Sequence, residues 1–246
     1  MHGAISVKED GFIRIEGEKC RPGCDYSCTK ACVNKALIIM GSYVTTDELM
    51  RRLDRDRPYW GADGGVTLGG GEPMFQPEFA IEVLERCQQN YIHTAMETCG
   101  HARWEYYERA LQHLDWLFFD IKHMNPARHR EGTGKSNELI LDNLERIVSK
   151  AKVNGKPCVI ARLPLIPGYN DSEENIAVTA EFVSRINLSE VNILPFHRLG
   201  VPKWERLGRE YKYKNTVPPA PEHVAGIKAV FDSYGVRCYI GANTPF

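Results

Sequence analysis

Four cysteines near the start of the chain have the residue type and spacing of metal ligands. They follow one another at uniform steps of four residues: Cys20, Cys24, Cys28 and Cys32. Cysteine thiolates bind zinc and the irons of iron–sulfur clusters. A four-cysteine zinc site usually pairs two separated knuckles, whereas these four fall within 13 residues. The spacing therefore favours an iron–sulfur apparatus, with structural zinc as the simpler alternative.

A second set of polar residues comes at or just after the carboxyl ends of successive predicted strands. Its members are Glu72, Glu97, Asp120 with Lys122, Arg162 and His197. In a parallel barrel the active site forms at that rim. Any one of these residues alone would be interpreted as a loop cap or a surface pair. Together they predict a ligand site.

The first rim segment is a glycine-rich turn, GGVTLGGGEPMFQPEF. Three glycines before Glu72 let the backbone approach a ligand closely, because no Cβ intervenes. A phosphate loop would need Lys-Ser or Lys-Thr after its last glycine, and Glu72-Pro73 follows instead. We expect the turn to receive a positively charged group with Glu72 as the anion. Because Lys122 and Arg162 suit a carboxylate, the two edges together suit an amino-acid moiety.

The elements that must position these residues alternate between strands and helices. Strand-like runs cover residues 65–68, 93–100, 116–123, 158–168, 190–197 and 236–241. Helical periodicity covers 45–53, 77–90, 104–114, 136–152, 171–186 and 218–235. This alternation predicts an α/β fold with a parallel sheet. A barrel or partial barrel fits better than a doubly wound sheet, because no glycine-rich phosphate fingerprint follows an early strand.

Composition is that of a globular enzyme. The chain has 246 residues, 43% apolar and 26% charged, with a formal charge of -1. The charge gives no reason to expect nucleic acid or an anionic membrane as a partner. The start MHGAISVKEDGF lacks the apolar core of a signal peptide. We therefore expect a cytoplasmic protein whose eight cysteines are thiols or metal ligands rather than disulfides.

Five segments together carry a resemblance to a known family. In chain order they are GGVTLGGGEPMFQPEF, HTAMETCG, LFFDIKHM, RLPLIPGYND and ILPFHRLG. This combination resembles the activating enzymes of glycyl radical enzymes, of which the pyruvate formate-lyase activases are the best known. They belong to the radical S-adenosylmethionine (SAM) superfamily. The resemblance covers residues from about 45 to 207 and implies a (β/α) barrel of the radical SAM type.

The resemblance implies roles for the glycine turn. Gly70, Gly71 and Glu72 match the family's GGE segment, which binds the amino group of SAM. The family usually has serine before this segment, where this chain has Gly69. Losing that hydroxyl weakens one hydrogen bond by about 1 kcal/mol.

The resemblance also implies roles for the other rim residues. Glu97 matches an acidic residue near the SAM carboxylate, and with Asp120 it would hold a monovalent cation, as in some relatives. Lys122 and Arg162 match basic residues beside the SAM carboxylate. His197 matches a histidine that lines the cofactor pocket.

The cysteine spacing departs from the family pattern. Radical SAM enzymes hold a [4Fe–4S] cluster by C-x3-C-x2-C, whereas Cys20, Cys24 and Cys28 give C-x3-C-x3-C, with Ser27 where a cysteine is needed. The stretch through Cys32 resembles instead the second half of a ferredoxin-like insert that many of these activases carry.

Two explanations of this departure stay open. Either the chain begins inside a longer protein, without the first barrel strand and the SAM cluster loop, or the four cysteines form one unorthodox cluster. Because no barrel strand is predicted before Gly65, we expect the first. This divides the chain into residues 1–44, part of the insert, and 45–246, a partial barrel. The other cysteines, Cys87, Cys99, Cys158 and Cys238, are expected in the core or at the rim.

The leading hypothesis is an activating enzyme, a monomer that generates a glycyl radical on a partner enzyme by reductive cleavage of SAM. Flavodoxin or ferredoxin would supply the electron. A different hypothesis is a SAM-binding or iron–sulfur protein without radical activity. The missing motif favours it, while the full set of rim residues argues against it. A barrel hydrolase ranks last, because no nucleophile–base pair is found.

Overall fold

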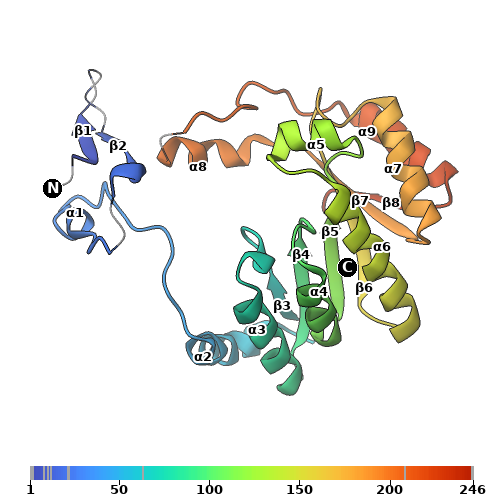
Figure 1. Ribbon diagram of the computed structural model, residues 1–246, viewed down its shortest axis with the longest axis horizontal. Helices are drawn as coiled ribbons and strands as arrows, with labels where there is room; N and C mark the ends of the chain where they lie inside the picture. The colour runs from blue at the N-terminus through green and yellow to red at the C-terminus, as the bar shows by residue number, and fades with distance from the viewer. Residues whose placement is uncertain are drawn as a thin grey trace. The chain divides into compact units, whose positions relative to one another are not determined.

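The computed structural model describes residues 3–7, 9, 11, 13–20, 23–62, 64–207 and 209–244. It divides into two compact units (Figure 1). The first consists of Met1–Thr45 with Arg198–Asn215, and the second of Thr46–His197 with Thr216–Phe246. All the predicted rim residues belong to the second unit.

The first unit contains only short elements. Strands β1 (Ile5–Val7) and β2 (Ile13–Ile15) form an antiparallel pair of their own. The helical turns are η1 (Gly17–Lys19), α1 (Ser27–Lys30), η5 (Arg198–Gly200) and α8 (Val201–Arg206). Among the described residues, no strand before Gly65 joins the larger sheet, as the sequence predicted. The ferredoxin-like character of residues 1–44 stays a prediction.

The second unit is built on a parallel sheet of six strands whose spatial order is their chain order (Figure 1). They are β3 (Gly65–Leu68), β4 (His93–Thr98), β5 (Trp116–Asp120), β6 (Cys158–Leu165), β7 (Glu190–Pro195) and β8 (Arg237–Ile240). In the part of the chain that the structure describes, β3 and β8 are edge strands that do not pair with each other. The sheet is therefore an unclosed, partial (β/α) barrel, which confirms the predicted fold class.

Helices precede or follow the strands, and most of them bury apolar residues against the sheet. They are α2 (Thr46–Asp56), α3 (Pro77–Gln89), α4 (Trp104–Ala110), α5 (Pro126–Thr133), α6 (Glu138–Asn154), α7 (Glu173–Arg185) and α9 (Pro221–Ser233). Single 3-10 turns occur at η2 (Arg57–Tyr59), η3 (Pro73–Phe75) and η4 (Leu111–His113). None of the helices in the described ranges is long and apolar enough to cross a membrane.

Helix α5 was missed by the sequence analysis because its signals lie at its ends. Its sequence, PARHREGT, has no apolar stripe, so periodicity could not reveal it. Asn125 caps its start by accepting hydrogen bonds from the backbone N–H groups of Ala127 and Arg128. Pro126 occupies the first turn, and Gly134 ends the helix in the left-handed conformation. Cap residues therefore mark both ends of this helix.

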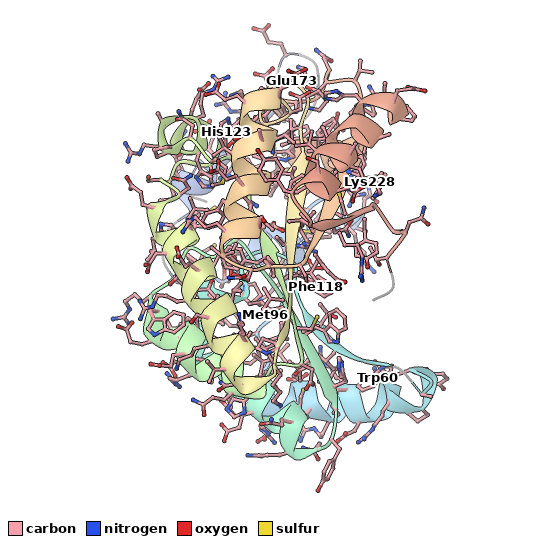
Figure 2. The ribbon with its side chains drawn as sticks, turned by 90° about the vertical axis from the view of Figure 1, so that its right-hand side faces the viewer. Trp60, Met96, Phe118, His123, Glu173 and Lys228 are labelled. Carbon is pink, nitrogen blue, oxygen red and sulfur yellow. The ribbon has the colours of Figure 1, made fainter. Side chains whose placement is uncertain are left out.

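The two faces of the sheet differ in what they contact. Leu117, Phe119 and Leu163 are 0% exposed and belong to the main core between sheet and helices. Figure 2 shows α6, α7 and α9 lying across this side of the sheet. Because side chains alternate along a strand, the residues between these point to the opposite side. We call that side the inner face and define it by Glu97, Phe118, Asp120, Arg162 and Asn192.

The turn after β4 places a glycine directly against the core. Gly100 has φ +79, and a Cβ at this position would lie 2.1 Å from the ring of Phe119. Phe119 is 0% exposed and has no room to move. We expect Gly100→Ala to lower the free energy of unfolding by about 3 kcal/mol, measured by urea denaturation.

Gly134→Ala is the matched control. Gly134 has φ +81, but nothing lies within 4 Å of an added Cβ. Its replacement should cost only about 1 kcal/mol, the strain of the left-handed conformation itself. Equal losses in the two variants would contradict the close packing of Gly100 on Phe119.

Candidate functional site

A row of four charged side chains crosses three neighbouring strands at their carboxyl ends. Arg162 on β6 donates from Nη1 to Glu97 Oε1 at 2.7 Å and from Nε to Asp120 Oδ1 at 3.0 Å. Lys122, two residues beyond β5, donates from Nζ to Asp120 Oδ2 at 3.0 Å. The register explains the row, because Asp120 pairs directly with Arg162 across β5 and β6. The structure thus joins four of the predicted site residues.

The row has two positive and two negative side chains, and Arg162 and Asp120 are better shielded from solvent than Lys122 and Glu97. The side chains of Arg162 and Asp120 are each 15% exposed, while Lys122 is 32% and Glu97 40% exposed. Burial lowers the pKa of Arg162, but the hydrogen bond to Glu97 and the charge of Asp120 outweigh it and raise the pKa above its usual value. Arg162 is therefore a permanent cation.

Arg162 uses only part of its donor capacity in this row. A guanidinium has five N–H donors, and the two bonds to carboxylates use two of them. Its planar group also lies over the ring of Phe118, with 5.7 Å from Cζ to the ring centroid. The remaining donors could bind an anionic group without disturbing the existing pairs.

The glycine turn lies beside this row. A Cβ added at Gly69 would lie 3.4 Å from Glu97 Oε2, so Gly69 borders the acidic end of the row. Gly70 has φ +88, which favours glycine. Nothing lies within 4 Å of a Cβ built at Gly70 or Gly71. The backbone of the turn is therefore open to a ligand.

The carboxylate of Glu72 is engaged by its own chain. Its Oε1 accepts hydrogen bonds from Met74 N at 3.1 Å and Thr98 Oγ1 at 2.8 Å. Its Oε2 accepts from Cys99 N at 2.7 Å. Glu72 thus ties the turn to the end of β4, and its expected role as the counter-ion of an ammonium group stays a prediction.

Cys99 is a neutral thiol in this surrounding. Burial and then a hydrogen bond to Glu72 raise the pKa of its thiol to about 11. At neutral pH it is therefore a thiol and not a thiolate. The expectation of core or rim positions is confirmed for Cys87 and Cys238, which are buried. It is wrong for Cys158, which is exposed as the first residue of β6, at the end of the strand opposite the rim.

Buried asparagines hold the loops that follow β5 and β6, and the sequence analysis did not find them. Asn170 is 0% exposed, and its Nδ2 donates to Lys122 O and Pro164 O at 2.8 Å each. Asn175 accepts from Met124 N at 3.0 Å and donates to Asn170 O at 2.8 Å. These bonds fix the backbone that carries Lys122. The signal in the sequence is that Asn170 lies within the RLPLIPGYND segment and Asn175 shortly after it.

Two further residues extend the row along the inner face. Asn192 on β7 pairs in register with Arg162, and Tyr239 on β8 pairs with Asn192. Asn192 is 5% exposed, and its Nδ2 donates to Gly241 O at 3.2 Å. Its Oδ1 is buried and accepts no hydrogen bond from the residues that the structure describes. The sequence could not identify Asn192 and Tyr239 as neighbours of the row, because neither residue stands at a strand end. Only the register of the sheet shows this.

His197 is the remaining rim residue that the sequence predicted. It lies two residues beyond the end of β7 and is exposed. Its predicted place in a cofactor pocket therefore stays a prediction.

The four-cysteine segment has the right donor atoms but not a ligand arrangement. Cys20 is exposed, and Cys24, Cys28 and Cys32 are half-buried, all as free thiols. Within the described ranges, no group of three or more His, Cys, Asp or Glu side chains is placed to hold a metal ion. As folded here these residues do not fit a [4Fe–4S] cluster. Their role as its ligands stays a prediction.

Comparisons with known proteins agree on one family. The model described as "Radical SAM superfamily" matches residues 19–180. A 4-hydroxyphenylacetate decarboxylase activating enzyme from Clostridium scatologenes is 41% identical over 245 residues, which cover 100% of this chain and 78% of the relative. An indoleacetate decarboxylase activating enzyme from Tractidigestivibacter scatoligenes is 34% identical over 249 residues, covering 97% of this chain and 77% of the relative.

A solved structure gives the same result. The crystal structure of a domain of pyruvate-formate lyase-activating enzyme from Bacteroides vulgatus ATCC 8482 is similar, with a TM-score of 0.61 and 31% identity. The similarity covers 73% of this chain and 99% of that one.

Because Arg162 bridges Glu97 and Asp120, we expect its replacement to reduce the stability of the fold. Arg162→Gln leaves the 15% exposed Asp120 without one of its two cationic partners, so we expect the free energy of unfolding to fall by about 2 kcal/mol. Urea denaturation at low and at high salt measures it. Arg109→Gln removes an exposed ion pair with Glu78 and should leave the midpoint unchanged. A midpoint that Arg162→Gln does not move would show that the row is not a supporting contact.

Proposed function

The chain belongs to the glycyl radical enzyme activating enzymes of the radical SAM superfamily, and from that premise we propose that the enzyme it activates is a glycyl radical decarboxylase of an arylacetate. The relatives that match the whole chain support this partner. Activating enzymes of 4-hydroxyphenylacetate decarboxylase cover 100% of it, and that of indoleacetate decarboxylase covers 97%. An isethionate sulfite-lyase activating enzyme, also 41% identical, matches only 85% of the chain.

The single observation that carries a SAM-binding role is the charged row beside an open glycine turn. SAM has an ammonium group and a carboxylate at its methionine end. The remaining N–H donors of Arg162 and the ammonium of Lys122 suit the carboxylate. The uncrowded backbone at Gly70 and Gly71 suits the ammonium group. The residues present therefore fit SAM.

The chain's own residues would bind and orient, while the chemistry comes from the cofactors. Family membership implies a [4Fe–4S] cluster and SAM, which together supply the radical that takes a hydrogen atom from the partner's glycine. Asp120 fixes both Arg162 and Lys122, so the two cations are already in place before a ligand arrives. Phe118, beneath the guanidinium, keeps water from one side of it. We derive no step through the cluster, because the described cysteines do not fit it.

Other parts of the proposal concern partners and surroundings. We propose flavodoxin or ferredoxin as the electron donor, a monomeric state and a cytoplasmic location. A monovalent cation near Glu97 and Asp120 would share their oxygens with Arg162 and Lys122. Glu97, with a side chain 40% exposed, is the carboxylate that such a cation would reach from solvent. Dependence of SAM affinity on potassium or sodium tests this part.

A second candidate is a SAM-binding protein without radical activity. One observation favours it: none of the residues described by the structure gather as a metal site. It shares the SAM site and differs only in lacking turnover. The same experiment separates the two.

That experiment is anaerobic reconstitution of the chain with iron and sulfide, followed by SAM, a reductant and an arylacetate decarboxylase of the glycyl radical type. Formation of 5′-deoxyadenosine and a glycyl radical signal in electron paramagnetic resonance would show that the chain activates its partner, and would contradict the expectation that its SAM cluster loop is missing. A decarboxylase with its radical glycine replaced by alanine is the control. A radical formed only on an isethionate lyase would overturn the partner. SAM binding without 5′-deoxyadenosine would favour the second candidate.

The role of Lys122 is tested by binding. Lys122→Gln keeps a hydrogen-bonding side chain but removes the charge, so the dissociation constant for SAM should rise about tenfold. Equilibrium dialysis with labelled SAM measures it. Lys150→Gln removes a surface ion pair with Glu108 and should bind SAM as the unaltered chain does. A normal affinity in Lys122→Gln would contradict the proposed carboxylate contact.

A further inference from the structure

A hydrogen-bond relay lies behind the glycine turn, on the helix-covered side of the sheet. Thr98 is the last residue of β4, is 3% exposed, and pairs in register with the buried Phe119. Its hydroxyl therefore faces the core and not the inner face. From there it reaches Glu72 Oε1 at 2.8 Å. The glycine turn thus passes over the end of β4, and Glu72 fixes it on the helix-covered side of the sheet.

The hydroxyl of Thr98 has no bonding capacity left. A hydroxyl has one proton and two lone pairs. The proton goes to Glu72, whose carboxylate can only accept, and one lone pair accepts from Gly100 N at 3.1 Å. The second faces the phenol of Tyr107, with 2.8 Å between the two oxygens. Tyr107 must be the donor in that bond, because the single proton of Thr98 is already used.

Tyr107 is suited to act only as this donor. It lies in α4 and is 0% exposed. Burial raises the pKa of its phenol far above the usual value, so the group is protonated at neutral pH and can donate. A buried phenol with no partner would be costly, and Thr98 is its acceptor. The relay from Tyr107 through Thr98 to Glu72 is therefore complete and directional.

The relay changes the interpretation of Glu72. Its carboxylate accepts three hydrogen bonds and also faces the neutral thiol of Cys99. A carboxylate has about four lone-pair positions, so little capacity is left for a ligand. What the turn presents outward is the backbone at Gly70 and Gly71.

We propose that Thr98 and Tyr107 are positioning residues for SAM, which hold the glycine turn in its binding conformation through Glu72. This inference rests on the function proposed above. It assigns Glu72 to the support of the turn and leaves recognition of the ammonium group to the backbone of the glycines.

Two substitutions of Thr98 test the relay. Thr98→Val keeps the shape and removes the hydroxyl, and Thr98→Ser keeps the hydroxyl and removes a methyl group. We expect the dissociation constant for SAM to rise about tenfold in the valine variant and to stay within about twofold of the unaltered chain in the serine variant. Rescue by serine separates the hydroxyl from the packing of the side chain.

Tyr107 is tested against its neighbour in the same helix. Tyr107→Phe removes only the phenol oxygen, and we expect a rise in the dissociation constant of about threefold. Tyr106→Phe is the matched control, because the Tyr106 phenol bonds Arg103 outside the relay. It should leave SAM binding unchanged.

A second readout needs no SAM. Hydrogen–deuterium exchange of the full chain should become faster in peptides covering 69–76 and 98–102 in Thr98→Val, and stay as it was in those covering 158–165. Faster exchange throughout, with a general loss of stability, would overturn a specific positioning role. Normal SAM affinity and normal exchange in both Thr98→Val and Tyr107→Phe would also overturn it, while the proposed function would stand. If the unaltered chain binds no SAM, the proposed function fails and this inference with it.

Discussion

The second unit depends on one guanidinium shared by two carboxylates. Arg162 links β4, β5 and β6 through Glu97 and Asp120. The parallel register of the three strands brings these side chains to the same level along the sheet. Without it, two carboxylates on adjacent strands would repel each other in a partly desolvated place. Because Lys122 completes the pairing, the row of Glu97, Asp120, Lys122 and Arg162 has no net charge and can accept a ligand that is itself a zwitterion. A neutral row with unused donors favours orientation over simple attraction.

The two faces of the sheet have different roles. The helix-covered face supplies stability through the core, and the inner face supplies the charges. The glycine turn belongs to both, because its outer side is open at Gly70 and its anchor, Glu72, is bonded behind β4. A turn of glycines has little conformational preference of its own. Contacts with neighbouring residues must therefore fix its conformation, and the buried Tyr107–Thr98 pair does so through Glu72.

The sequence predicted the features that depend on local pattern. Alternating strands and helices gave the parallel sheet, and polar residues at strand ends gave Glu97, Asp120, Lys122 and Arg162. It could not predict which groups pair across the sheet. Thr98 looks like a strand residue and Tyr107 like a helix residue until the fold brings their hydroxyls to 2.8 Å. Helix α5 and Asn170 were missed because their stabilising contacts are caps and bonds to distant backbone.

The cysteine segment and the rim obey different physical constraints, and this explains why one is formed and the other is not. The rim is held by strand register, a buried core and ion pairs made within the chain, so it needs no ligand to take shape. A cluster site of short loops has no such support, and metal binding supplies much of its folding free energy. Cys20, Cys24, Cys28 and Cys32 lie in a unit with two short strands and a single turn of α1. An arrangement of ligands in that unit is therefore expected to follow the binding of iron and sulfide and not to precede it.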